Sequence, residues 1–157
     1  MRKRIISEPR RTEPAPEHNW LRVGDLAEVE ITSEDPAHPI ESALLPGEGA
    51  GWRAAEPGAQ SVRLLFDPPQ RLRWIRLDFL ETDTERTQEY VLRWSADGGK
   101  SFRDIVRQQW NFSPAGTTTE QEDHRVDLAG VTVLELTITP EIGGRPVFAS
   151  LRQMRIA

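Results

Sequence analysis

The sequence contains no cysteine, and it has only three histidines and one tyrosine in 157 residues. Without cysteine there is no disulfide and no thiolate metal site, and such a composition fits a reducing compartment. Long apolar runs are also missing, because Ile5-Ile6 is followed at once by Ser7 and a charged, proline-containing stretch. A signal peptide needs about 7–15 apolar residues and a membrane helix about 20. We therefore expect a cytoplasmic protein with no membrane partner.

Signatures of catalysis are missing as well. The histidines, His18, His38 and His124, lack the spacing of a metal site. Ser113 does not stand in the G-x-S-x-G context of an activated nucleophile. No glycine-rich loop precedes a helical segment, so the sequence does not support a phosphate site. We expect neither an enzyme nor a bound cofactor.

Charge is distributed unevenly along the chain. The whole sequence has a net charge of −5, but residues 1–11 hold five bases and one acid. Residues 12–157 therefore hold 15 bases against 24 acids. A body this acidic repels phosphate backbones, and no basic patch is interleaved with aromatic residues. We expect no nucleic-acid partner.

The composition changes near Trp20. Residues 1–19 are rich in proline, arginine and glutamate, which predicts an irregular leader. Residues 20–157 have the length of one compact domain. We predict one folded domain over 20–157, preceded by the leader.

Short segments with period-two alternation follow one another through this domain. In the clearest, residues 72–80, the apolar residues Ile75, Leu77 and Phe79 alternate with charged ones. No stretch keeps a helical period over ten residues, so we predict an all-β, eight-stranded antiparallel jelly-roll sandwich without long helices. The expected strands are 27–33, 61–66, 72–80, 89–95, 102–109, 124–128, 131–139 and 151–156. Residues predicted to be buried are Ile75, Leu77, Phe79, Leu92, Leu134, Leu136 and Ile138.

Turn-forming residues separate these segments. The tandem prolines of 67–70 cannot continue a ladder and predict a turn. Residues 96–100 (ADGGK) predict a tight hairpin, because Asp and Gly tolerate positive φ. A further turn is expected at 129–130 (Ala-Gly).

Five tryptophans are the main functional signal, since aromatic rings stack against the apolar faces of sugars. Trp74 and Trp94 lie within predicted strands and are expected to be core or sheet-covering residues. Trp110, Asn111 and Phe112 stand where a strand meets a polar loop. This trio is our candidate exposed binding platform, and the alternative is a hydrophobic anchor for the loop that follows.

Motifs between Gly51 and the C-terminus resemble a known family. Gly51-Trp52 followed by a strand, the strand 74–79 (WIRLDF) and the hairpin 90–102 occur in the order found in discoidin-type (coagulation-factor type C, galactose-binding-like) domains. Residues 149–156 (ASLRQMRI) are similar to the closing strand of that family. The resemblance covers about Ala27 to Ala157 and implies an eight-stranded jelly roll.

The resemblance also implies where a ligand would bind. In this family Trp52 would pack beneath the binding loops, and His38 and Arg53 would lie on loops that gather at one end of the sandwich. Many members hold calcium with an Asp and a Glu, but Pro46 and Gln153 occupy those positions here. Because calcium prefers several charged oxygen ligands, we predict no metal site.

These observations favour a non-catalytic recognition module that binds carbohydrate or a similar polar ligand through its end loops. The candidate ligand-binding residues are Trp110, Asn111, Phe112, Arg53 and His38. The alternative is a protein-interaction or homo-oligomerisation module with the same fold, which would use aromatics on a sheet face. An enzyme is the third and least supported hypothesis.

Overall fold

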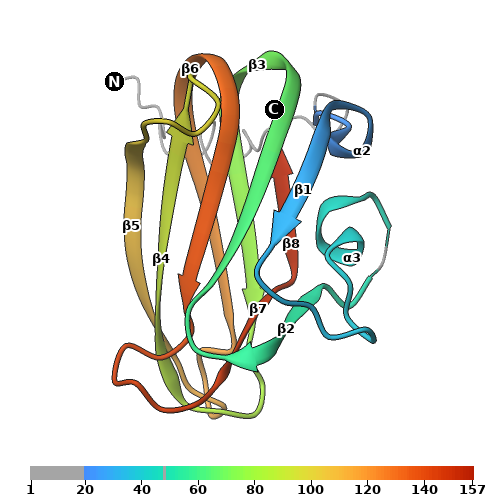
Figure 1. Ribbon diagram of the computed structural model, residues 1–157. Helices are drawn as coiled ribbons and strands as arrows, with labels where there is room; N and C mark the ends of the chain where they lie inside the picture. The colour runs from blue at the N-terminus through green and yellow to red at the C-terminus, as the bar shows by residue number, and fades with distance from the viewer. Residues whose placement is uncertain (1–19, 48) are drawn as a thin grey trace, which may run out of the picture.

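Strands form most of the chain, as the alternation of apolar and polar residues predicts (Figure 1). The computed structural model describes residues 20–47 and 49–157. The leader predicted at 1–19 lies outside these described residues. The elements are α2 (Val23–Leu26), β1 (Ala27–Ile31), α3 (Glu41–Leu44), β2 (Trp52–Pro57), β3 (Gln60–Leu80), β4 (Arg86–Ser95), β5 (Arg103–Phe112), β6 (Thr119–Thr139), β7 (Phe148–Leu151) and β8 (Gln153–Ile156).

Two of these strands are much longer than predicted, because β3 and β6 each run through a segment expected to be a turn. The ladder between them pairs Leu65 with Val133, and then resumes at Gln70 with Val131. The tandem prolines interrupt the pairing, and both strands arch over together at the top of Figure 1 and run back along the other layer. The chain reversals predicted at 67–70 and at 129–130 are therefore confirmed, but each is a bend within one long strand and not a turn between two strands.

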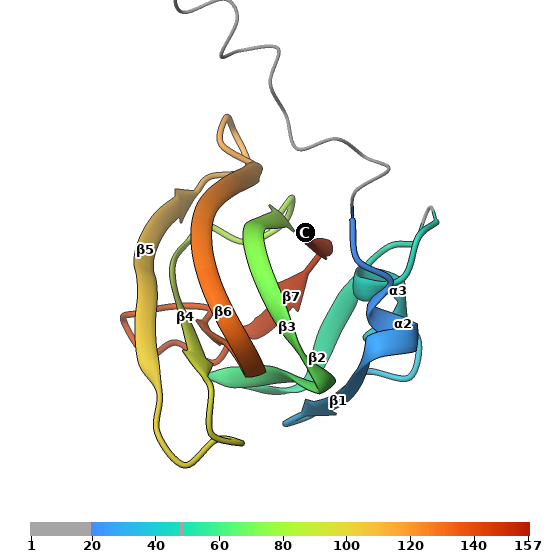
Figure 2. The ribbon, with the colours of Figure 1, turned by 90° about the horizontal axis from the view of Figure 1, so that it is seen from above.

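These bends divide each long strand between the two layers of a sandwich. One layer contains β1, residues 60–65 of β3, residues 131–139 of β6, β4 and β5. The other contains residues 119–128 of β6, residues 72–80 of β3, and β8. A small β2–β7 ladder lies beside them, and both short helices lie on the β1 side (Figure 2). The antiparallel sandwich is confirmed.

The core lies between the layers and follows the predicted alternation. All seven residues predicted to be buried are at most 1% exposed. Trp52, Tyr90 and Phe112 add large rings to the same cluster. Burial of this apolar area, at about 25 cal/mol per Å², is the main favourable term for the fold.

The β4–β5 hairpin forms as predicted. Asp97 accepts hydrogen bonds from the Ser101 amide at 2.9 Å and from the Ser95 and Ser101 hydroxyls at 2.6 Å. These bonds lower the pKa of the Asp97 carboxyl, with the Ser101 side chain contributing most. Gly98 adopts φ +75°, which a side chain would disfavour. Asp97 therefore holds a rigid turn.

Candidate ligand-binding site at one end of the sandwich

Five connections meet at the lower end of the sandwich in Figure 1. They join β1 to α3, β2 to β3, β3 to β4, β5 to β6, and β6 to β7. The β4–β5 hairpin and the C-terminus lie toward the opposite end. Loops carried at one end of a rigid sandwich are the usual location of a binding site.

Trp52 fixes the base of this end. Its side chain is 1% exposed, and its Nε1 donates to the Ser33 carbonyl at 3.1 Å. The preceding Gly51 has φ +92°, and a Cβ there would come within 2.5 Å of the Leu151 carbonyl oxygen. Only glycine allows the chain to pass this close to β7. The Gly-Trp pair therefore joins β2, β7 and the loop after β1.

That loop folds back on β2 and brings two predicted residues together. The Asp35 amide donates to the Arg53 carbonyl at 2.8 Å, and the Arg53 amide donates to the His38 carbonyl at 3.2 Å. His38 and Arg53, 15 positions apart in the sequence, therefore lie side by side in the fold. The resemblance placed both residues on loops, but only His38 lies on a loop, because Arg53 belongs to β2.

Asp35 orients the His38 ring. The His38 Nδ1 lies 3.2 Å from the Asp35 Oδ2, and the Ala37 amide donates to Oδ1 at 3.0 Å. The bond from Ala37, followed by the one from His38, lowers the pKa of the Asp35 carboxyl. Asp35 is therefore a carboxylate at neutral pH. Both side chains remain more than a third exposed, so a ligand can reach them.

An aromatic ring that sequence analysis did not select completes the arrangement. Phe148, at the start of β7, is 36% exposed, and the Arg53 guanidinium carbon lies 5.4 Å from its ring centroid. A guanidinium at this distance is attracted to the ring by a cation–π interaction. We name Asp35, His38, Arg53 and Phe148 the end cluster. It combines one apolar ring with donors and an acceptor on exposed positions.

The three residues of the predicted platform, Trp110 to Phe112, do not form one exposed surface. Phe112 is 1% exposed, and the Arg86 guanidinium carbon lies 4.7 Å from its ring centroid. The prediction of an exposed Phe112 is wrong. Phe112 instead fits the alternative interpretation, a hydrophobic anchor for the loop that follows. Trp110 is half-buried against the core. Asn111 is exposed, with its Oδ1 accepting from the Thr87 hydroxyl at 2.7 Å.

Arg86 explains why Phe112 is covered. This fully buried guanidinium donates to Glu81 at 2.7 Å, and to Gln88 and the Pro140 carbonyl at 2.9 Å. It therefore ties the β3–β4 connection to the loop that leads to Phe148. The sequence around Arg86 carries no signal of this role, because a charged residue in an alternating strand is expected to face water.

Glu120 is a carboxyl group with a pKa near neutrality, but it does not belong to the end cluster. Burial, and then the nearby Glu122 charge, raise its pKa to about 7. Its side chain is 1% exposed and accepts from Gln88 at 3.3 Å. A substrate could not reach this group, so its raised pKa is a consequence of burial and not a sign of catalysis.

The described part of the chain contains neither a metal-binding cluster nor a membrane-spanning helix. No group of three or more His, Cys, Asp or Glu side chains there could hold a metal ion. Across residues 20–47 and 49–157, no helix is long and apolar enough to cross a membrane.

We predict that calcium will not stabilise the domain. Gln153 lines a polar hollow with Asp78 and Ser42, and Asp78 is the one carboxylate among the residues that line it. A ligand that binds only the native state raises its melting temperature. Addition of calcium or a chelator should leave the melting temperature unchanged in differential scanning fluorimetry. A reproducible rise with calcium would contradict this prediction.

Comparison with known proteins identifies the fold. No family model and no curated protein matches the sequence. A Clostridium perfringens CBM32 module solved with GalNAc-β-1,3-galactose is 20% identical, with a TM-score of 0.65 over 88% of this chain and 99% of that one. CBM32-3, from a family 31 glycoside hydrolase of the same organism, is 17% identical, with a TM-score of 0.67 over 91% and 97%. A Ruminococcus gnavus GH29 fucosidase gives a TM-score of 0.71 at 7% identity, but only 29% of its chain is covered. The chain therefore has the galactose-binding-like, discoidin-type fold.

Proposed function

We propose that this domain is a non-catalytic recognition module that binds carbohydrate through the end cluster. The observation that carries the proposal is the exposed Phe148 ring, with Arg53 against it and His38 beside Arg53. Solved modules of the same fold contain GalNAc-β-1,3-galactose and galactose in their complexes. Those ligands belong to those proteins, and they support carbohydrate as the ligand class here.

The chemistry of the cluster suits a sugar ring. A pyranose can place its apolar C–H groups against Phe148, while its hydroxyls stay hydrogen-bonded at the edge. Arg53 supplies N–H donors, and the Asp35 carboxylate supplies an acceptor. His38 is held by Asp35 through Nδ1, which leaves Nε2 to face a ligand.

The same cluster is poorly suited to hydrolysis. Glycosidases usually place two carboxyl groups on either side of the scissile bond, one of them protonated. The end cluster holds one carboxyl group, Asp35, whose lowered pKa keeps it ionised. The cluster therefore contains no protonated carboxyl group that could act as the general acid. Recognition without bond cleavage is the simpler function.

Replacement of Phe148 by alanine tests this proposal. A glycan array followed by calorimetry should show roughly a tenfold loss of affinity, corresponding to about 1–2 kcal/mol for an aromatic hot spot. The melting temperature should change little, because Phe148 is partly exposed.

Phe102→Ala is the matched control. Phe102 is also covered by arginines, with Arg93 at 4.4 Å and Arg63 at 5.5 Å, but it follows the β4–β5 hairpin at the other end. This variant should keep wild-type affinity. Equal losses in both variants, or no glycan bound by the wild type, would contradict the proposal.

A further inference from the structure

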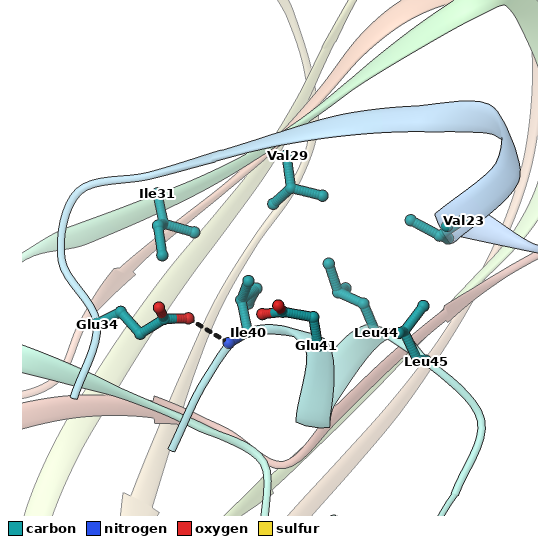
Figure 3. Close-up of a pocket in the computed structure, with 9 residues that line it drawn as sticks. Val23, Val29, Ile31, Glu34, Ile40, Glu41, Leu44 and Leu45 are labelled. Atoms are coloured by element: carbon teal, nitrogen blue, oxygen red, sulfur yellow. Dashed lines mark hydrogen bonds between the residues drawn. The ribbon is translucent and has the colours of Figure 1, made fainter. Parts of the chain in front are cut away.

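A second hollow lies away from the end cluster, between β1 and α3. Its volume is about 350 Å³, and its lining is mostly apolar. Figure 3 shows Val29 and Ile31 on β1 facing Ile40 and Leu44 across it. Glu34 lies at one side, where its Oε1 accepts from the Ile40 amide at 2.6 Å. We name this hollow the β1–α3 groove.

The groove runs beside an open strand edge. Among the described residues, β1 is the terminal strand of its layer and pairs only with β3. Beyond that ladder, the Ala27 amide donates to the Val23 carbonyl of α2, and no further backbone hydrogen bond of residues 28–31 is found within the described ranges. Another hollow is lined by Glu30 on β1 and Arg63 on β3, and it shares Val29 and Ile31 with the groove. An uncovered edge of this kind can accept another strand.

Charge restricts what could cover this edge. Glu28 and Glu30 are exposed and alternate along β1 with Val29 and Ile31. Two more acidic residues, Glu34 and Glu41, line the groove. A complementary strand would therefore carry basic residues on the face that meets Glu28 and Glu30. On the face that meets the groove it would carry one apolar and one basic residue.

We propose that the segment Arg-Lys-Arg-Ile-Ile, residues 2–6 of this chain, binds along the β1 edge as an added strand. With Ile5 directed into the groove, period-two alternation places Lys3 on the same face, near Glu34 and Glu41. Arg2 and Arg4 then lie on the side of Glu28 and Glu30. This is an intramolecular contact on the β1 side, and it does not depend on the carbohydrate proposal.

The position of the chain makes this contact reachable. Trp20, the first described residue, lines a hollow that shares Val23, Leu44 and Leu45 with the β1–α3 groove. Between Ile6 and Trp20 the chain can span roughly 45 Å when extended. The basic segment therefore joins the domain next to the edge that it would cover.

Amide hydrogen exchange tests the proposal on the full chain. Ile5→Asp and the charge reversal Glu28→Lys/Glu30→Lys should each speed exchange within residues 27–31 by roughly tenfold or more at low salt, because the covering strand is lost. High salt should weaken the protection in the wild type, because it screens the attraction between the basic segment and the carboxylates of Glu28 and Glu30. An unchanged melting temperature of Ile5→Asp would check that the sandwich stays folded in this variant.

Glu56→Lys/Asp104→Lys is the control. Both residues are exposed and lie on other strands, so exchange in 27–31 should match that of the wild type. If residues 27–31 exchange equally fast in the wild type and in Ile5→Asp, the proposal is wrong. Protection that rises with protein concentration would assign the edge to a second copy and would also overturn it.

Discussion

Replacement of Trp52 by alanine is expected to cost about 3–5 kcal/mol of unfolding free energy, the usual range for a fully buried large aromatic. The loss has two sources. The side chain is 1% exposed within the core, and its Nε1 is the donor that holds the Ser33 carbonyl. Because that loop continues to Asp35 and His38, carbohydrate binding should fall as well. Urea denaturation and calorimetry measure the two effects.

Trp94→Ala is the matched control for this variant. Trp94 lies on β4 and is only half-buried, with Arg103 5.9 Å from its ring. Its removal should cost less than half as much stability, and it should leave affinity unchanged because Trp94 lies next to the β4–β5 hairpin. If both variants lose the same stability and the same affinity, the role assigned to Trp52 is wrong.

Stability should fall as pH rises through about 7, and Glu120 is the expected cause. The ordinary pKa of this carboxyl is 4.5, and in the folded domain it is raised to about 7. The folded state therefore holds a proton that the unfolded state has lost between these values. This contribution is fully present below 4.5 and disappears as pH passes 7, for a total of up to about 3 kcal/mol.

Glu120→Gln isolates this effect. Glutamine keeps the size and a hydrogen-bonding amide beside Gln88, but it does not ionise. In chemical denaturation between about pH 5 and pH 8, the unfolding free energy of the variant should therefore fall less with rising pH than that of the wild type. His124 acts in the opposite sense, because burial lowers its pKa, and it is present in both proteins.

Asp127→Asn is the control for the pH series. Asp127 lies on the same strand, but its side chain is 69% exposed and pairs with Arg71 at the surface. Exposed ion pairs contribute little to stability, so this variant should follow the wild-type pH profile. A Glu120→Gln protein with an unchanged pH profile would show that Glu120 is not the titrating group.

Period-two alternation was sufficient to predict the sandwich and its core. Ile75, Leu77 and Phe79 are buried because alternate residues of a strand face the same layer. The same rule does not show whether a strand ends at a chain reversal or continues through it. Residues 67–70 interrupt the ladder and reverse the chain, and the pairing with β6 on both sides shows that they lie within β3.

The candidate site was predicted only in part, because burial depends on partners distant in sequence. The family resemblance placed His38 and Arg53 on loops at one end, and it did not show that Arg53 lies on β2 with its backbone bonded to that of His38. Phe112 was expected to be exposed, but Arg86 on the neighbouring strand covers it. Phe148 carried no distinctive motif, and its exposure follows from its place at the start of β7, next to Arg53.

The most direct test of carbohydrate recognition at the end cluster is an NMR titration of the isotope-labelled domain with galactose and N-acetylgalactosamine. We predict that amide shifts will concentrate at residues 35–38, at Arg53 and at 147–150, and that Phe148→Ala will reduce them severalfold at a sugar concentration near the wild-type Kd. Residues 108–112 on β5 should move little. Shifts concentrated on β5 around Trp110, or no shift with either sugar or with any array-selected glycan, would contradict the account.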